Sequence, residues 1–135
     1  MIYTNSDGGA RGNPGPGAIG VLVREDGKIL TKYSTFIGKN VTNNIAEYSA
    51  LIFALQEALM LKLENIKVNT DSQLLYRQLK KIYKIKNPNI LGLYNQISQL
   101  MPAFKEVTFN HISRDHNRGA DKLANLAIKQ ALKKK

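Results

Sequence analysis

Cysteine and tryptophan are both absent from this sequence. Without cysteine there can be no disulfide, no thiolate nucleophile and no zinc site built on thiolates. A chain free of disulfides is typical of a reducing compartment, so we expect a cytoplasmic protein. The length of 135 residues and the hydrophobic content of 43% suit one globular domain, which we place at 1–135.

Acidic residues are scarce. Ten Asp and Glu stand against 20 Lys and Arg, which gives a formal net charge of +10. Part of this charge is the run 133–135, and taking its three lysines from +10 still leaves +7. A chain this basic favours an acidic partner, most simply nucleic acid, although solubility alone is the alternative explanation.

Long hydrophobic runs are also missing. The longest apolar stretch, 50–63, is interrupted by Gln56, Glu57 and Lys62, which makes it too polar to span a bilayer. The first residues alternate like a strand and show no basic segment followed by an apolar run. We therefore expect neither a membrane span nor a signal peptide.

The apolar pattern that is present predicts alternating strands and helices. Strands are expected at 1–7, 18–24, 29–37, 66–70 and 107–112, and helices at 43–63, 72–83, 90–100 and from 117 onwards. The Gly- and Pro-rich segment 8–17 is expected to be a turn region. The order βββ-α-β-α-α-β-α predicts an α/β fold, a five-stranded mixed sheet with helices on both faces. Its first, fourth and fifth strands should be parallel neighbours, with their carboxyl ends at one edge.

Four acidic residues stand at the ends of these elements, and each has an ordinary local explanation. Asp7 precedes two glycines and suits a turn. Glu47 follows Asn44 by three residues, which resembles a capping box. Asp71 precedes a helix and suits an N-cap, and Asp121 suits the first turn of the last helix.

The topology, however, brings these four acids towards the same edge of the sheet. Carboxylates in contact repel by about 4 kcal/mol per pair at 4 Å with an effective dielectric near 20. Such a cluster persists when divalent cations occupy it. Oxygen donors without Cys or a convincing His site favour Mg²⁺ or Mn²⁺ over zinc.

Four motifs carry a family resemblance. In chain order they are Asp7-Gly8-Gly9-Ala10-Arg11-Gly12-Asn13-Pro14-Gly15-Pro16-Gly17, Thr42-Asn43-Asn44-Ile45-Ala46-Glu47, Thr70-Asp71-Ser72-Gln73 and Asn117-Arg118-Gly119-Ala120-Asp121. In order and spacing they resemble the motifs of ribonuclease H type 1, over essentially the whole chain. The resemblance implies the ribonuclease H-like fold, which agrees with the element order.

The resemblance also implies a mechanism. In that family the acids matching Asp7, Glu47, Asp71 and Asp121 coordinate two Mg²⁺ ions. One ion activates the attacking water and the other steadies the leaving 3′-oxygen. The implied reaction is endonucleolytic hydrolysis of the RNA strand of an RNA–DNA hybrid, which leaves 5′-phosphate and 3′-hydroxyl ends.

Substrate contacts are implied for a set of polar residues, since a hybrid displays 2′-hydroxyls that amides can read without reading sequence. The matching positions are Asn13, Asn43, Asn44 and Gln73 for the minor groove and backbone, and Thr42 for a phosphate of the DNA strand. Turn and cap chemistry is the alternative for this set.

Two departures from the family pattern stand out. The loop 111–117 is short, and where many relatives carry a catalytic histidine we expect Arg114 to act, with His116 as second choice and His111 as a structural residue. A tryptophan-bearing basic helix found in some relatives is missing. The lysines that remain there are Lys80, Lys81, Lys84 and Lys86. We expect them to form a reduced phosphate-binding patch, or a solvated helix face.

We expect no separate hybrid-binding domain before Asp7, and therefore modest and steeply salt-dependent affinity for substrate. We expect a monomer without an obligate protein partner. Three alternatives stay open: a non-catalytic nucleic-acid-binding module, a junction resolvase or transposase-like nuclease on the same fold, and a domain released from a reverse transcriptase.

Overall fold

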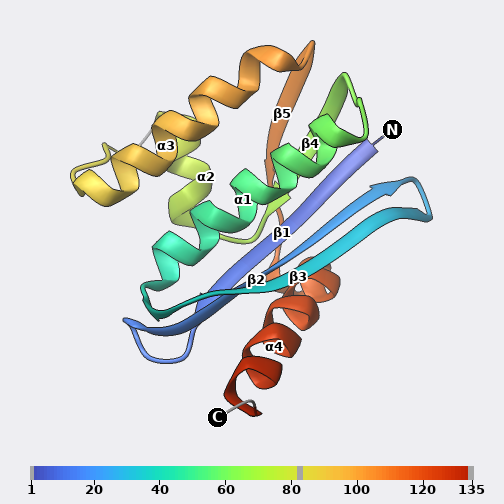
Figure 1. Ribbon diagram of the computed structural model, residues 1–135. Helices are drawn as coiled ribbons and strands as arrows, with labels where there is room; N and C mark the ends of the chain where they lie inside the picture. The colour runs from blue at the N-terminus through green and yellow to red at the C-terminus, as the bar shows by residue number, and fades with distance from the viewer. Residues whose placement is uncertain (1, 82–83, 134–135) are drawn as a thin grey trace.

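The computed structural model describes residues 2–81 and 84–133 (Figure 1). The strands are β1 (Ile2–Ala10), β2 (Gly15–Glu25), β3 (Lys28–Val41), β4 (Asn65–Thr70) and β5 (Glu106–His111). The helices are α1 (Asn43–Met60), α2 (Gln73–Leu79), α3 (Pro88–Leu100) and α4 (Arg118–Lys133), with short 3₁₀ turns η1 (Met101–Ala103) and η2 (Arg114–Asn117). The predicted order of elements is confirmed.

The strands form one sheet in the order β3-β2-β1-β4-β5. Neighbours β1, β2 and β3 are antiparallel, whereas β4 pairs in parallel with both β1 and β5. The predicted five-stranded mixed sheet is therefore confirmed. Ser6 pairs with Thr70, and Thr70 pairs with His111, so the three parallel strands reach the same edge together.

The end of β1 differs from the prediction. The strand continues through Ala10, because residues 8–10 keep pairing with 17–19 of β2 after the parallel pairing with β4 has stopped at Ser6. The expected turn over 8–17 is reduced to 11–14. Asp7 is thus not the last residue of its strand, but it is the first residue beyond the parallel part of the sheet.

The helices cover the two faces of the sheet unequally. Helices α1, α2 and α3 lie on one side and α4 lies alone on the other (Figure 1). Helix α1 ends at Met60, three residues before its predicted end. Helix α2 ends at Leu79, and the last two residues of its predicted range, 82–83, lie outside the described residues.

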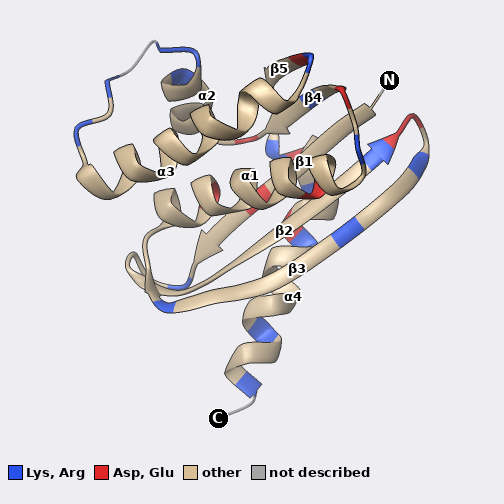
Figure 2. Cartoon of the chain, turned by 45° about the horizontal axis from the view of Figure 1, so that its top comes forward, with Lys and Arg blue, Asp and Glu red and all other residues tan. Residues whose placement is uncertain are grey.

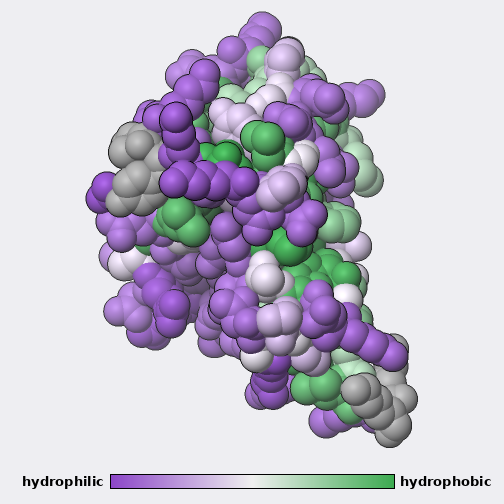
Figure 3. Space-filling model, turned by 90° about the vertical axis from the view of Figure 1, so that its left-hand side faces the viewer, coloured by the Kyte–Doolittle hydropathy of each residue, from purple (hydrophilic) through white to green (hydrophobic). Residues whose placement is uncertain are grey.

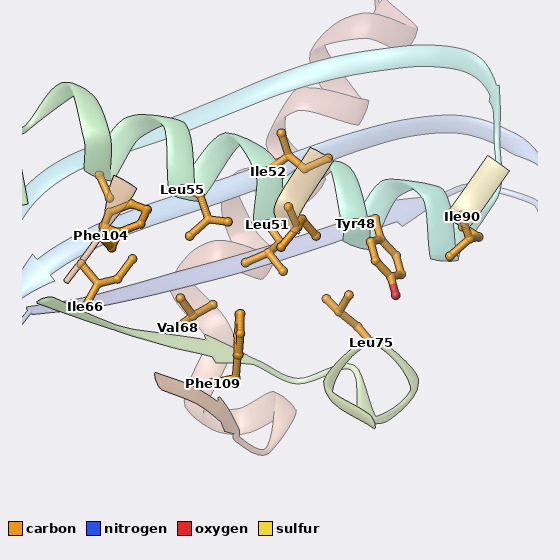
Figure 4. Packing of buried hydrophobic residues seen from close by; sticks show 12 residues of the cluster. Tyr48, Leu51, Ile52, Leu55, Ile66, Val68, Leu75, Ile90, Phe104 and Phe109 are labelled. Atoms are coloured by element: carbon orange, nitrogen blue, oxygen red, sulfur yellow. The ribbon is translucent and has the colours of Figure 1, made fainter. Parts of the chain in front are cut away.

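The main core fills the space between α1 and the sheet. Leu51 and Leu55 of α1 are fully buried and point towards Val68 and Phe109 (Figure 4). Burying each such side chain stabilises the fold by about 1.5–3 kcal/mol. Because α1 is apolar over most of its circumference, it anchors firmly and fixes the position of its first turns at the sheet edge. None of the helices in the described ranges is both long enough and apolar enough to cross a membrane.

Candidate active site

The four acidic residues of the motifs converge on one small cavity at the sheet edge. Its volume is about 250 Å³. The lining residues are Asp7, Gly8, Gly9, Asn43, Glu47, Asp71, Arg114 and Asp121. These residues come from β1, from the first turns of α1, from the end of β4 and from the η2–α4 segment. The cavity therefore gathers positions from the whole length of the chain.

Two glycines bring the helices close enough for this. A Cβ built on Gly8 would lie 2.1 Å from the carbonyl oxygen of Ala46, and one on Gly20 would lie 2.1 Å from that of Ala120. Gly8 follows Asp7, and Gly20 is the residue that pairs with Asp7 across the strands. Since Ala46 and Ala120 each precede an acid of the cavity, both helices pack directly on the backbone beside Asp7.

Glu47 and Asp71, the acids near the starts of α1 and α2, do not cap these helices. Thr42 caps α1 by accepting a hydrogen bond from the Ile45 backbone N–H at 3.2 Å. Ser72 caps α2 by accepting one from the Leu75 N–H at 3.1 Å. The local explanations of Glu47 as part of a capping box and of Asp71 as an N-cap are therefore wrong. Each cap is a neighbouring hydroxyl, which leaves both carboxylates for the cavity.

The surroundings of Asp7 in the cavity strongly raise the pKa of its carboxyl group. Burial raises the pKa of this carboxyl from 3.8 to about 8, helped by a hydrogen bond with Asp121 and by the charges of Asp71 and Glu47. With no cation near, the Asp7 carboxyl therefore keeps its proton close to neutral pH.

The pKa of Glu47 is also raised, although some of its neighbours lower it. Burial raises its pKa, and the Asp71 charge adds to this. A hydrogen bond from the Ser72 hydroxyl and the Arg114 guanidinium act in the opposite sense. Arg114 is thus close enough to the carboxylates to stabilise their charge.

The donor set suits a hard divalent cation, although the carboxylates do not form a ready cage. Within residues 2–81 and 84–133, no three His, Cys, Asp or Glu side chains stand in an arrangement that would hold an ion. The hydrogen bond with Asp121 that helps to raise the pKa of Asp7 is consistent with a proton held between these two carboxyls. The residues fit an ion that displaces that proton and draws the oxygen ligands together.

Asn117 has a role in the site that the sequence did not reveal. Its side chain is 1% exposed. Its amide nitrogen donates to Asp71 Oδ2 at 3.1 Å and to the Ser6 carbonyl at 2.9 Å. The sequence carries a signal only for two other amides: Asn5 and Asn69 each precede an acid of the cavity by two residues. That repeated spacing indicates amide side chains beside the carboxylates.

Among the residues expected to contact substrate, only Asn43 is a lining residue of the cavity. Its side-chain oxygen accepts from the Ala10 N–H at 2.9 Å. The Asn13 side chain accepts from the Asn43 N–H at 3.0 Å, which ties the Gly-rich turn to α1. The Asn44 side-chain oxygen is buried without a hydrogen-bond partner among the described residues. Gln73 is exposed at the start of α2.

The structure distinguishes the two residues of the short loop that could act in place of the family's catalytic histidine. Arg114 lines the cavity. The exposed His116 is hydrogen-bonded through Nδ1 to the Ser113 hydroxyl at 2.7 Å and is not among the lining residues. The His111 ring packs against that of Tyr76, with centroids 5.8 Å apart.

Lysine and arginine positions are spread over β3, α4 and the connection between α2 and α3 (Figure 2). The face that carries this connection is mostly hydrophilic (Figure 3). Lys81 and Lys84 line a second cavity of about 250 Å³ there, together with Tyr94 and other residues of α2 and α3. Lys80 and Lys86 are exposed beside it. A basic patch therefore lies between α2 and α3, on residues 80–81 and 84–86.

Comparison with known proteins finds a family model and several related sequences that match nearly the whole chain. A family model described as reverse transcriptase-like matches residues 5–127. The chain is 38% identical over 131 residues to ribonuclease HI of Halobacterium salinarum, covering 96% of this chain and 65% of that protein. It is 36% identical over 132 residues to the bifunctional protein Rv2228c of Mycobacterium tuberculosis, covering 96% of this chain and 36% of that protein. The chain thus spans about a third to two thirds of the length of these relatives.

A solved structure of a ribonuclease H1 is also similar to this chain. The crystal structure of LC11-RNase H1 in complex with an RNA/DNA hybrid superimposes with a TM-score of 0.92 at 40% sequence identity. The match covers 98% of this chain and 99% of that one.

Proposed function

This chain belongs to the ribonuclease H type 1 family, and from that premise we propose that it is an endoribonuclease acting on the RNA strand of RNA–DNA hybrids. The products would carry 5′-phosphate and 3′-hydroxyl ends. The observation that carries the proposal is the convergence of four carboxylates and Arg114 on one cavity of a strongly basic chain. The LC11 relative, whose structure contains a hybrid, supports the substrate class.

In this proposal Asp7, Glu47, Asp71 and Asp121 hold two divalent cations, Mg²⁺ or Mn²⁺. When bound, the pair supplies an activated water and neutralises the charge that develops on the scissile phosphate. Asp7 would hold a cation as its carboxylate, so binding would require the loss of the proton that burial favours on this group. Arg114 places a guanidinium next to the carboxylates, where it can stabilise the negative charge of the phosphate.

The polar residues at the mouth of the cavity would position the hybrid. The side-chain oxygens of Asn13 and Asn43 already hold backbone N–H groups, so their amide nitrogens are the atoms suited to contact substrate oxygens. Asn44 offers a buried acceptor that has no partner among the described residues. Thr42 and Gln73 complete the set as proposed contacts, with Thr42 also serving as the cap of α1.

The rest of the proposal concerns the setting. All four acids come from one chain, so a monomer suffices for a complete site. The lack of cysteine suits the reducing cytoplasm. The basic patch between α2 and α3, which contains Lys81 and Lys84, would hold a phosphate backbone.

A panel of substrates tests the function. Purified protein is incubated with an RNA–DNA hybrid, double-stranded RNA, double-stranded DNA and a four-way junction, each with Mg²⁺ and with EDTA. We expect Mg²⁺-dependent cleavage of the RNA strand of the hybrid, with 3′-hydroxyl ends that a polymerase can extend. Preferred cleavage of the junction or of double-stranded DNA would instead indicate a resolvase or a transposase-like nuclease.

The variant Asp71→Asn separates catalysis from binding. It keeps the size of the side chain and removes one charged ligand, so we expect cleavage to fall on the order of 10³-fold while the hybrid still binds. Binding by the wild-type chain without any cleavage would indicate a non-catalytic binding module. Unchanged cleavage by Asp71→Asn would refute the assigned site.

A further inference from the structure

A row of hydrogen-bonded side chains leads from a surface arginine to the cavity. The Arg24 Nε donates to Asn5 Oδ1 at 3.2 Å, and Asn5 Nδ2 donates to Asn117 Oδ1 at 3.1 Å. Asn117 Nδ2 then donates to Asp71 Oδ2 at 3.1 Å. The row therefore connects the far half of β2 to one of the carboxylates through two amides.

The direction of this row is dictated by its two ends. A guanidinium can only donate, so the oxygen of Asn5 must face Arg24 and its nitrogen must face Asn117. The oxygen of Asn117 then faces Asn5, and its nitrogen faces Asp71. An ionised carboxylate can only accept, so the other end requires the same orientation.

Burial makes a reversal unfavourable. The Asn5 side chain is 4% exposed and that of Asn117 is 1% exposed, so water cannot replace a lost partner. A flipped Asn117 would turn its oxygen towards both the Asp71 carboxylate and the Ser6 carbonyl, which are acceptors. Without Arg24, however, the only donor left to the oxygen of Asn5 in the described structure would be the Asn69 amide, at the longer distance of 3.5 Å.

Two further amides strengthen the row from the side. Asn69 Nδ2 approaches Asn5 Oδ1 at 3.5 Å, and Asn110 Nδ2 donates to Asn69 Oδ1 at 3.2 Å. Asn69 Nδ2 approaches the same oxygen that Arg24 holds, and the bond from Asn110 fixes the Asn69 amide in that orientation, so both favour the same orientation of Asn5. The shorter Arg24 bond, made by a charged donor, is the stronger restraint.

We propose that Arg24 positions the Asp71 carboxylate through Asn5 and Asn117, as a one-way relay of hydrogen bonds. The relay holds Asp71 Oδ2, so the carboxylate cannot rotate freely about its Cβ–Cγ bond. Arg24, Asn5 and Asn117 are then positioning residues for the reaction proposed above, on which this inference rests. Groups that orient metal ligands in this way commonly change affinity or activity by about 10–100-fold when removed.

The chain offers a matched control for Arg24. Lys67 also places its charge over the Tyr3 ring, at 6.0 Å from the centroid against 5.1 Å for Arg24. Both residues are half-buried. The bonds of the relay in the described structure do not include Lys67. The variants Arg24→Met and Lys67→Met therefore remove the same charge from the same ring, and only the first breaks the relay.

The first measurement is kcat and KM for a hybrid with saturating Mg²⁺. Two bonds separate Arg24 from Asn117, so we expect Arg24→Met to lower kcat about fivefold, below the range for direct partners of a ligand. Lys67→Met should change kcat less than about twofold, while both variants shift KM alike through the lost charge. Arg24→Lys keeps a donor-only cation and should lie closer to wild type than to Arg24→Met.

The second measurement needs no catalysis. We expect the side-chain amide protons of Asn117 to exchange slowly in the wild type, because they are buried and hydrogen-bonded, and to exchange faster in Arg24→Met alone when followed by NMR. Calorimetric titration with Mg²⁺ should show weaker binding to Arg24→Met than to Lys67→Met.

The outcomes separate this inference from the proposed function. Equal kcat values for Arg24→Met and Lys67→Met, or Arg24→Lys as slow as Arg24→Met, would overturn the relay. If the wild-type chain cleaves no hybrid, the proposed function fails, and the amide exchange of Asn117 decides the relay by itself: unchanged exchange in Arg24→Met would refute it.

Discussion

The two faces of the sheet differ in how many polar side chains they bury, although both have apolar contacts, such as those of Ala18 with α4. Under α1, α2 and α3 the contacts are apolar, as between Leu55 and Val68 (Figure 4). On the other face, α4 packs against β1, β2 and β3, and the hydrogen-bonded amides Asn5, Asn69 and Asn110 cross β1, β4 and β5. The first face supplies stability, whereas the second supports a cavity whose carboxylates repel one another. Stability and function are therefore separable by mutation.

Leu55→Ala should have the largest effect on stability. Leu55 is fully buried in the core under α1, so its truncation should lower the free energy of unfolding by about 2–5 kcal/mol. The kcat of the folded fraction should stay near wild type, since the cavity is on another part of the sheet. Chemical denaturation and active-site titration measure the two quantities, and a parallel fall in kcat would show that the regions are not separable.

Gly20→Ala should damage both regions. The new methyl would meet the Ala120 carbonyl at 2.1 Å, so α4 must shift and move Asp121 with it. We expect a loss of about 1–3 kcal/mol of stability, together with a fall in kcat. Gly27→Ala is the matched control, because nothing lies within 4 Å of a Cβ there. If Gly20→Ala behaves like Gly27→Ala, the close packing of α4 does not set the site.

Asp7→Asn should trade function for stability. The folded-state pKa of Asp7 is raised above its value in an unfolded chain, so its contribution is fully present below pH 3.8 and is lost as the pH rises to about 8. Without divalent cations, the variant should therefore unfold at a higher temperature than the wild type at pH 8, with a gap that closes towards pH 4.

The expected gain is a few degrees, at about 4 °C per kcal/mol for a domain of this size. Thermal denaturation in EDTA measures it, and added Mg²⁺ should raise the melting temperature of the wild type more than that of Asp7→Asn. A wild type that is more stable at pH 8 than at pH 5 in EDTA would contradict the raised pKa.

Lysine substitutions in the basic patch should have the smallest effect. The double variant Lys84→Ala, Lys86→Ala should raise KM for the hybrid a few-fold and leave kcat unchanged. Each lost phosphate contact reduces the slope of log affinity against log salt by about 0.9. Lys129→Ala with Lys133→Ala on α4 is the control of equal charge, and an identical effect of both pairs would indicate a nonspecific charge effect.

Much of the fold followed from local patterns. Alternation and helical spacing predicted every strand and helix, and the element order predicted that β1, β4 and β5 are parallel neighbours; the structure places β4 between the other two. The errors arose where tertiary pairing decided the outcome. Gly8 and Gly9 indicate a turn by themselves, yet they continue β1 because β2 pairs with them.

The site was predictable as a set of acids but not as a network. The motifs indicated the four carboxylates and the short loop indicated Arg114; the catalytic roles of all five remain proposals. Capping was assigned to the wrong residues, because Thr42 and Glu47 both suit a helix start and only the structure decides which one caps. The relay joins positions 5, 24, 71 and 117, and no local pattern connects an arginine on β2 with an acid after β4.

The central claim is that four separate acids act as one metal-dependent site. Its most direct test is the cleavage rate of a hybrid by Asp7→Asn, Glu47→Gln, Asp71→Asn and Asp121→Asn, alone and combined. Residues that act as a unit are not additive. We therefore predict that each single variant loses nearly all Mg²⁺-dependent cleavage and that combining them adds little. A single variant with wild-type activity, or losses that simply multiply, would contradict the account.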